Sequence, residues 1–575
     1  MKKLFSYLKD YKKESVFGPL FKLFEASLEL IVPLVVAAVI DKGIAEKDNG
    51  YIIRMCILLA GLGFAGLICS VTAQYFAAKA SAGFAKKIRR ALYEHIQGFS
   101  YKTLDNIGIP TLITRMTADT NQVQTGLNLA LRLLLRSPFV VFGAMIMAFT
   151  IDVRSALWFA LSIPILSTVV FGIMLISIPM YKKVQGSLDK VLGVTRENLT
   201  GVRVLRAFGK EEDEIENFRQ KNVTLTSMQK LVGKISALMN PATYVLINIA
   251  VILLLRTDAV RVDQGLLTQG QVVALYNYMS QILVELIKLA NLIINITKSV
   301  ACGKRIQAVL DIPAGEDTVD GLPCGDPGVK VCFKDACISY TDGAEDALSG
   351  IDLNVMKGET VGIIGGTGSG KTTLVNLIPR FYDVTGGQVL VDGVDVRSVP
   401  VDELRAKIGI VPQKAVLFKG SIRDNLKWGN EDADDETIMQ AVRTAQAEDV
   451  INAKGGLDAL IEQSGRNLSG GQRQRLSIAR ALVRKPEILI LDDSSSALDF
   501  ATDAALRSSL GKLDYSPTVF IVSQRTSSVR YADKIVVLDE GKAAGIGSHE
   551  ELLKNCSVYR EIYDSQFKKE VSGDE

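Results

Sequence analysis

One glycine-rich run in the second half of the chain carries the residue types that hold phosphate groups: Gly365-Gly366-Thr367-Gly368-Ser369-Gly370-Lys371-Thr372-Thr373. It follows an apolar, strand-like stretch at 360–364 and precedes a helical segment. Glycines let backbone N–H groups wrap around phosphates, Lys371 adds a positive charge near the β- and γ-phosphates, and Thr372 offers a hydroxyl to Mg²⁺. We therefore expect a nucleoside triphosphate site formed by Gly365, Thr367, Gly368, Ser369, Gly370, Lys371, Thr372 and Thr373.

A carboxylate stands at the end of a second strand-like run. Four apolar residues at 488–491 lead to Asp492, and a carboxylate in that place holds Mg²⁺ through water on the opposite side of the phosphates. Further apolar runs at 389–391, 519–522 and 535–538 alternate with helical segments. This alternation predicts an α/β sheet domain, with Thr372 and Asp492 as magnesium ligands.

The first half of the chain has the composition of a membrane domain. Hydrophobic residues make up 48% of the 575 residues, and the mean hydropathy of +0.22 is high for a soluble protein. Apolar runs near or above the ~20 residues that cross hydrocarbon occur at about 16–40, 52–78, 127–150, 156–180, 240–256 and 271–298. Six spans place both termini on one side, and basic clusters near 2–3, 12–13, 86–90 and 182–183 indicate that this side is the cytosol.

Ionisable residues within the predicted spans are costly in a membrane and usually face protein or an aqueous cavity. Glu25 and Glu29 share one face of the first span, and a polar stripe on the sixth comprises Glu285, Lys288, Asn291 and Asn295. Two interpretations stay open. These side chains line a translocation path, or Glu285 and Lys288 neutralise each other while the asparagines bond neighbouring helices.

The predicted domain organisation is a transmembrane domain with long cytosolic helical hairpins at 1–312, a linker at 313–328, an ATP-binding α/β domain at 329–567 and a polar tail at 568–575. A net charge of +3 is too small to indicate a nucleic acid partner. Seven cysteines without paired spacing and two histidines argue against a zinc or iron–sulfur site.

The segment Leu468-Ser469-Gly470-Gly471-Gln472 opens a helix, so Ser469 and backbone amides at the helix N-terminus can meet a γ-phosphate. Together with the glycine-rich run and Ser496-Ala497-Leu498-Asp499, it makes nearly the whole chain resemble a half-transporter of the ABC exporter superfamily. The resemblance implies an all-α six-helix transmembrane domain followed by an α/β P-loop ATPase that binds ATP and Mg²⁺.

Several residue roles follow from this resemblance. Tyr340 is similar to the aromatic residue that stacks on adenine, and Gln413 to a glutamine that touches the metal and responds to the transmembrane half. Two stretches, 107–119 and 197–208, look like turns that dock on a nucleotide domain. In the family two cassettes sandwich two ATP molecules, so the signature residues Ser469, Gly470, Gly471 and Gln472, with Asp499, contact ATP across the sandwich.

Two positions depart from the family pattern: Asp493 stands where a catalytic glutamate is usual, and Gln524 where a histidine is usual. An aspartate withdraws its carboxylate by roughly an ångström, and a misplacement of that order can lower a rate ~10²-fold. Gln524 can hydrogen-bond a γ-phosphate but cannot carry the charge of an imidazolium. We expect Asp493, Gln524 and Gln413 to form a site that binds ATP and hydrolyses it poorly.

The expected function is ATP-driven export of small amphipathic molecules (drug, lipid or peptide) by a heterodimer with a second, non-identical half-transporter. The pair would lie in the plasma or inner membrane, in contact with lipid, and would have twelve transmembrane helices as the family implies. Three alternatives remain: a homodimer with slow turnover, an exporter-shaped importer of a metal chelate, and an ATP-gated regulatory membrane protein that moves no substrate.

Overall fold

The computed structural model describes residues 2–315, 328–341 and 345–567. The chain divides into two compact units. The helical unit comprises residues 1–97 and 109–313, and the sheet unit comprises residues 98–108 and 314–575. Most of the predicted linker at 313–328 and the whole tail at 568–575 lie outside the described residues, so these limits stay predictions.

Six helices of the described chain are long and apolar enough to cross a membrane, which confirms the predicted number of spans. They cover Lys3–Ile44, Asn49–Gln97, Ile109–Ile151, Val153–Thr200, Glu211–Asp263 and Gln269–Leu310. Each is longer than its apolar run, because the helix continues into polar sequence. The second has 49 residues, which at ~1.5 Å per residue is about 73 Å.

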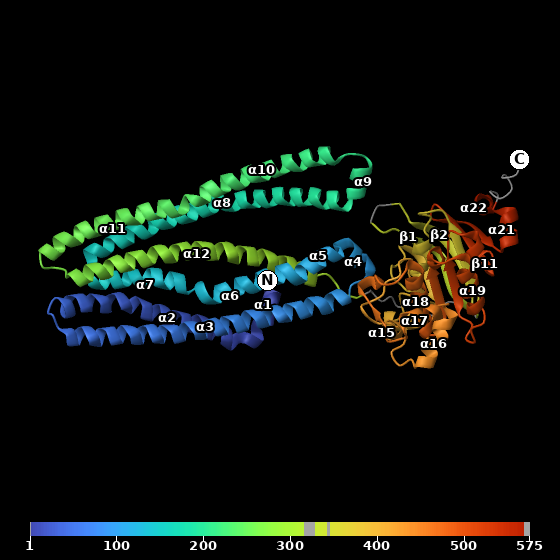
Figure 1. Ribbon diagram of the computed structural model, residues 1–575, viewed down its shortest axis with the longest axis horizontal. Coiled ribbons are helices and arrows are strands. Elements are labelled where there is room, and N and C mark those ends of the chain that lie inside the picture. Colours follow the sequence, from blue (N-terminus) through green and yellow to red (C-terminus); the bar gives the residue numbers. More distant parts are fainter. Residues whose placement is uncertain (1, 316–327, 342–344, 568–575) are drawn as a thin grey trace. The chain divides into compact units, whose positions relative to one another are not determined.

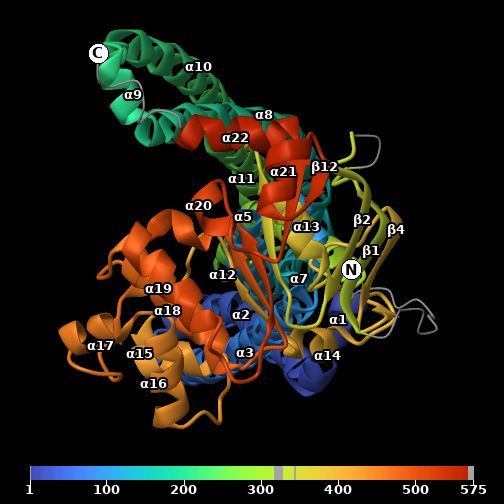
Figure 2. The ribbon, with the colours of Figure 1, turned by 90° about the vertical axis from the view of Figure 1, so that its right-hand side faces the viewer.

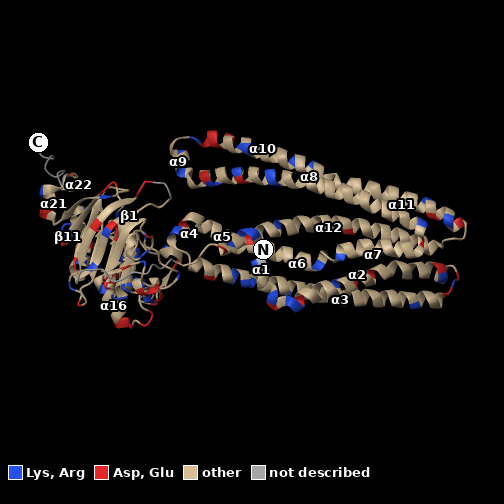
Figure 3. Cartoon of the chain, turned by 180° about the vertical axis from the view of Figure 1, so that it is seen from behind, with Lys and Arg blue, Asp and Glu red and all other residues tan. Residues whose placement is uncertain are grey.

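The elements of the helical unit are α1 (Lys2–Phe5), α2 (Lys12–Ala38), α3 (Asn49–Gln97), α5 (Ile109–Thr114), α6 (Thr120–Leu133), α7 (Arg136–Ile151), α8 (Val153–Thr200), α9 (Val202–Ala207), α10 (Glu211–Ala237), α11 (Met239–Asp263) and α12 (Gln269–Leu310), with short 3-10 or π turns η1 (Ser6–Tyr11), η2 (Val39–Ile44) and η3 (Arg115–Asp119). In Figure 1, α8 runs beside α10 and α11, and α12 runs beside α7. Buried apolar side chains of α2, α7, α8, α11 and α12 form the core of this unit. Figure 3 shows its charged residues gathered toward the helix ends, with a nearly uncharged stretch between them.

The sheet unit contains β1 (Val329–Ile338), β2 (Leu348–Met356), β3 (Thr360–Gly365), β4 (Gly386–Val391), β5 (Val394–Asp395), β6 (Ile408–Val411), β7 (Gly420–Ser421), β8 (Leu460–Ile461), β9 (Ile488–Asp492), β10 (Thr518–Val522), β11 (Lys534–Asp539) and β12 (Lys542–Gly547). Its helices are α4 (Tyr101–Ile107), α13 (Lys371–Leu377), α14 (Val401–Ala406), α15 (Ile422–Lys427), α16 (Asp435–Thr444), α17 (Glu448–Lys454), α18 (Gly470–Val483), α19 (Phe500–Leu510), α20 (Thr526–Val529), α21 (His549–Asn555) and α22 (Ser557–Phe567), with 3-10 turns η4 (Gln463–Gly465) and η5 (Ser494–Ala497). Figure 2 shows α18 and α19 on one side of the strands and β1, β2 and β4 on the other.

The main sheet has six strands in the order β12-β11-β3-β10-β9-β6. Its strands are parallel except for β12, which pairs antiparallel with β11. Val522 at the end of β10 pairs with Ile363 on β3 and with Asp492 at the end of β9. Because parallel strands end at the same edge, the segments that follow β3, β9 and β10 meet there. The predicted α/β sheet domain is therefore confirmed.

The first predicted docking turn was placed too late in the chain. The segment that packs on the sheet unit is α4, whose Tyr101 ring stacks on Phe381 with centroids 4.3 Å apart. Tyr382 donates a hydrogen bond from Oη to Asp105 Oδ2 at 2.6 Å. Gly108 follows α4 with a left-handed φ of 78°, and residues 109–313 belong to the helical unit. The second predicted turn contains α9, between α8 and α10.

Candidate nucleotide-binding site

The glycine-rich run, called the P-loop below (365–373), joins β3 to α13. Gly368 and Gly370 have left-handed φ values of 84° and 96°, and a Cβ at Gly370 would lie 2.6 Å from Leu348 Cδ2. Lys371 is 9% exposed, and its Nζ donates to the carbonyl oxygens of Gly365 at 3.0 Å and Gly366 at 2.5 Å. The loop thus folds around its own ammonium group.

Two features of the P-loop fit a phosphate ligand. Ser369 Oγ is buried without a hydrogen-bond partner among the described residues, and an anionic oxygen would give it one. Burial lowers the pKa of Lys371, whereas the nearby carboxylates of Asp493 and Asp492 oppose that shift. A phosphate would add negative charge beside this ammonium and favour its charged form.

Thr372 and Asp492, the predicted magnesium ligands, are adjacent. Thr372 donates from Oγ1 to Asp492 Oδ1 at 3.0 Å, and Asp492 is 4% exposed at the end of β9. Burial raises the pKa of the Asp492 carboxyl, and the Asp493 carboxylate raises it further. A hydroxyl beside a buried carboxylate is an oxygen donor set that suits Mg²⁺, and a bound dication would stabilise the ionised carboxylate.

Asp493 occupies a left-handed backbone conformation with φ 45° and ψ 33°. Its N–H donates to Val522 O at 3.0 Å, which ties it to the neighbouring strand β10. Gln413, two residues after β6, donates from Nε2 to Asp493 Oδ2 at 3.3 Å. The structure therefore brings Gln413 and Asp493 together beside Asp492.

Gln524 is the second residue after β10, at the edge where β3 and β9 also end. Its side chain is exposed. The preceding residue, Ser523, is buried, and its N–H donates to Ile363 O on β3 at 3.1 Å. Gln524 is thus placed between the strand that leads into the P-loop and the strand that ends at Asp492.

Tyr340 lies against the first turn of α13. Its Oη is 2.9 Å from Thr373 Oγ1, and its ring meets the Tyr382 ring edge to face at 5.0 Å. The residue is 40% exposed, so part of its ring is open to a ligand. Tyr382 also bonds Asp105 of α4. Our sequence analysis did not identify Tyr382, because nothing in the local sequence pattern places it beside Tyr340.

The signature residues form a separate group. Ser469 caps α18 through a capping box: its Oγ accepts from Gln472 N at 3.2 Å, and Gln472 Oε1 accepts from Ser469 N at 2.9 Å. A Cβ at Gly471 would lie 3.0 Å from Ala497 O, in the segment that leads to Asp499. Asp499 in turn caps α19, accepting from Thr502 N at 3.3 Å. Within the described chain no hydrogen bond joins Ser469–Gln472 to the P-loop.

Glu29, Glu285 and Lys288 of the predicted spans join Arg136 in an ion network in which Arg136 and Glu285 are buried. Arg136 is 7% exposed and donates to Glu285 Oε1 and to Glu29 Oε2, each at 2.6 Å. Lys288 pairs with Glu285 at 2.8 Å, and Glu25 pairs with Lys22. Sequence reasoning missed Arg136, which stands at the start of α7. A cavity of about 400 Å³ is lined by Glu29, Val32, Val140, Gln281, Glu285 and Lys288, among others.

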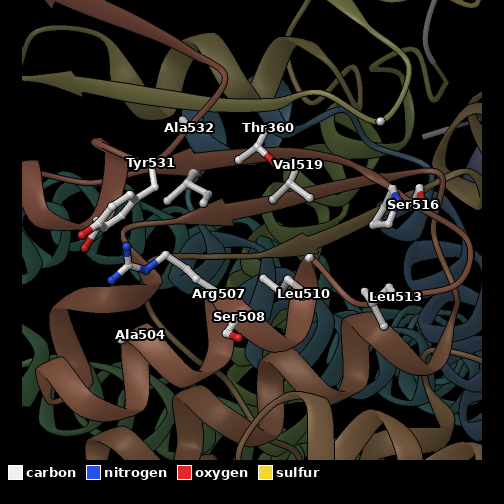
Figure 4. A pocket seen from close by; sticks show the side chains of 15 residues that line it. Thr360, Ala504, Arg507, Ser508, Leu510, Leu513, Ser516, Val519, Tyr531 and Ala532 are labelled. Atoms are coloured by element: carbon white, nitrogen blue, oxygen red, sulfur yellow. The ribbon is translucent and has the colours of Figure 1, made fainter. Parts of the chain in front are cut away.

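Another cavity, of about 450 Å³, lies between α19 and the strands β3 and β10 of the sheet unit (Figure 4). Arg507 and Tyr531 stand at one end of it, and Leu513 and Ser516 at the other. None of the site residues predicted from the sequence lines this cavity.

Comparison with known proteins gives the family. Residues 16–286 match the model of the ABC transporter transmembrane region, and residues 348–496 match the ABC transporter model. An uncharacterized ABC transporter ATP-binding protein of Mycobacterium tuberculosis is 35% identical over 97% of each chain. An ATP-dependent lipid A-core flippase of Syntrophus aciditrophicus is 33% identical over 85% of this chain and 81% of its own, and a putative multidrug export ATP-binding/permease protein of Bacillus subtilis is 30% identical over 98% of this chain and 99% of its own.

Among solved structures, a bacterial Atm1-family ABC exporter with ATP bound has a TM-score of 0.81, with 23% identity over 97% of this chain and 98% of that one. That likeness shows the fold. An ATPase domain of this family implies ATP binding. The chain therefore belongs to the ABC transporter family, as a multi-pass membrane protein in which a six-helix transmembrane domain of exporter fold is fused to an ATP-binding domain.

Proposed function

We propose that this chain is one subunit of a heterodimeric ABC exporter, and that its own Walker site binds ATP but hydrolyses it slowly. The observation that carries the proposal is the placement of Asp493. It lies directly after Asp492 and beside Gln413, where a general base would have to reach the attacking water. An aspartate in that place falls short by roughly an ångström, which can cost ~10²-fold in rate.

The backbone at this position supports the same interpretation. A left-handed φ of 45° costs an ordinary residue ~1–2 kcal/mol, whereas aspartate tolerates it. A hydrogen bond from Gln413 also occupies the shorter carboxylate. Gln524 at the end of β10 keeps the ability to bond a γ-phosphate but lacks the imidazole that a histidine would supply.

The residues that would serve the second site are intact. Ser469 and Gln472 order the first turn of α18 through a reciprocal capping box, so backbone N–H groups at this helix end can meet the γ-phosphate of ATP held by a partner cassette. We infer that the partner supplies the glutamate and histidine of the faster site. Both unusual residues, Asp493 and Gln524, belong to the Walker half of this chain's own site, whereas its signature residues are intact. A heterodimer with one slow and one fast site explains this distribution better than a homodimer in which both sites have lost activity.

Small amphipathic molecules are the substrate class that we propose. The cavity in the helical unit combines apolar side chains such as Val32 and Val140 with the charges of Glu29 and Lys288, and such a lining suits molecules with both characters. Two relatives are named as a lipid A-core flippase and a putative multidrug exporter. We place the sheet unit and both termini in the cytosol, in line with the basic clusters.

The test is to measure ATPase activity and oligomeric state of this chain in lipid, alone and co-expressed with the product of the neighbouring gene. Little activity alone and brisk activity in a one-to-one complex are the expected result. Vigorous turnover by a homodimer would overturn the heterodimer. Flux in inside-out vesicles then separates export from import of a metal chelate, and ATPase without any flux would indicate a regulatory protein.

A further inference from the structure

The last helix of the described chain contacts the segment that carries Gln524. This segment, Ser523–Thr526, follows β10 and is called the switch segment below. Gln566 on α22 spans it with both ends of its amide: Nε2 donates to Gln524 O at 2.8 Å, and Oε1 accepts from Thr526 N at 2.8 Å. A bidentate contact of this kind fixes both the distance and the orientation of the backbone between the bonded groups.

The contact with Gln566 provides a hydrogen-bond acceptor that the residues at the start of α20 do not provide. Thr526 is the first residue of α20, and Arg525 at the N-cap makes no side-chain capping bond. Thr526 is fully buried, so its N–H needs an acceptor within the protein. Gln566 provides that acceptor from a helix some forty residues further along the chain.

The helix that carries Gln566 is itself firmly placed. Tyr559 of α22 is fully buried in the core of the sheet unit, and its Oη lies 2.7 Å from His549 Nδ1 of α21. The ring of Tyr563 also lies against the His549 ring of α21, with centroids 5.6 Å apart. The two hydrogen bonds of Gln566, called the clamp below, therefore hold the switch segment against a helix whose own position is fixed by the sheet unit.

The other side of the switch segment is tied to the residues that lead to Asp499. Arg525 donates from Nη1 to the carbonyl oxygens of Ser495 at 3.4 Å and Leu498 at 3.3 Å. Its guanidinium also lies 5.1 Å from the Phe500 ring centroid. With Gln566 on one side and these carbonyls on the other, the backbone of Gln524 is held between two anchors.

We infer that Gln566 is a positioning residue for Gln524: it orients the switch segment so that the Gln524 side chain meets the γ-phosphate of ATP bound at the P-loop. The inference rests on the proposed ATP site. Of the phosphates of the nucleotide, Gln524 would contact only the γ-phosphate, which ADP lacks. Loss of the clamp should therefore weaken the binding of ATP and leave the binding of ADP unchanged. A role in holding the domain together would affect both nucleotides alike.

The test measures ATP and ADP affinities of the full-length chain in lipid nanodiscs by displacement of trinitrophenyl-ATP. Gln566→Ala should lower the ratio of ATP to ADP affinity about five- to tenfold, the scale of one ordinary hydrogen bond, with ADP affinity within about twofold of the wild type. Ser565→Ala is the matched control, because Ser565 Oγ bonds Ile562 O within the same helix, and it should leave the ratio unchanged.

A double-mutant cycle shows whether Gln566 acts through Gln524. In the Gln524→Ala background, Gln566→Ala should change the ratio less than about twofold. Equal weakening of ATP and ADP, or a full effect in the Gln524→Ala background, would overturn the inference. So would a wild-type ratio in Gln566→Glu, which keeps an acceptor for Thr526 N–H but sets a carboxylate against Gln524 O. Failure of the export proposal would appear in vesicle flux and would leave this binding comparison intact.

Discussion

Restoring the usual pair of catalytic residues, by Asp493→Glu together with Gln524→His, should speed hydrolysis at this chain's own site. The added methylene advances the carboxylate by roughly an ångström, and a gain of ~10²-fold corresponds to about 2.7 kcal/mol of the activation barrier. The backbone at position 493 has a left-handed φ of 45°, and a glutamate in this conformation would lower the free energy of unfolding by ~1–2 kcal/mol. The barrier term is larger, and the backbone cost falls on stability rather than on the chemical step.

The assay is single-turnover hydrolysis of radiolabelled ATP in the assembled complex, with the P-loop lysine of the partner replaced so that this site alone is read. We expect ~10²-fold faster release of phosphate and shorter retention of ATP, with a small drop in melting temperature. Asp493→Asn is the isosteric control, since it removes the charge and keeps the shape. If the double variant hydrolysed ATP no faster and retained it for as long as the wild type, the reasoning from carboxylate reach would fail.

Three further outcomes are expected. Tyr382→Phe keeps the ring but removes the bond to Asp105; amide hydrogen exchange of α4 should become up to about fivefold faster, near 1 kcal/mol for one exposed bond, with ATP affinity unchanged. Arg136→Met removes the buried cation beside Glu285 but leaves that carboxylate its bond to Lys288, so it should destabilise the helical unit by about 1–3 kcal/mol in thermal unfolding, and Arg136→Met with Glu285→Met should recover most of the loss. Burial lowers the pKa of His549, so the fold favours the neutral ring, and stability should be fully present above the unfolded pKa of ~6.5 and fall as the pH drops below it; His549→Gln should flatten that slope in melting curves recorded between pH 5 and 8.

The number of membrane spans, and the order of the helical domain followed by the α/β domain, could be predicted because each depends on a pattern that is local in the sequence. A long apolar run that crosses lipid forms a helix when it is not part of a barrel, so the spans were found. The long polar segments between them were predicted as helical hairpins, but without the helix bounds. The docking helix α4 was missed for a related reason. Residues 101–107 carry no distinctive periodicity, and their role depends on Phe381 and Tyr382, far along the chain.

The placement of the P-loop between a strand and a helix, and of Asp492 at a strand end, could be predicted at residue level, whereas their roles in phosphate and metal binding stay predictions. The left-handed φ values at Gly368 and Gly370 disfavour residues with a Cβ, and a carboxylate at a strand end is a narrow chemical requirement. Arg136 belongs to the opposite case. A single arginine at a span boundary is compatible with snorkelling to the interface, and only the fold shows that it joins Glu29 to Glu285.

Gln566 shows where sequence reasoning stops. A glutamine near the end of a polar helix satisfies its amide equally well with water, so neither its type nor its spacing predicts a partner. Its importance comes from the buried N–H of Thr526, which needs an acceptor because Arg525 cannot cap α20. A sequence search for similar contacts would therefore begin from helix starts that lack a hydrogen-bond acceptor. These are short helices that follow a strand ending at the nucleotide site, begin with a buried residue and have no capping side chain at the N-cap. Where a distant side chain accepts from such an N–H, as Gln566 does from Thr526, that side chain becomes able to influence the site.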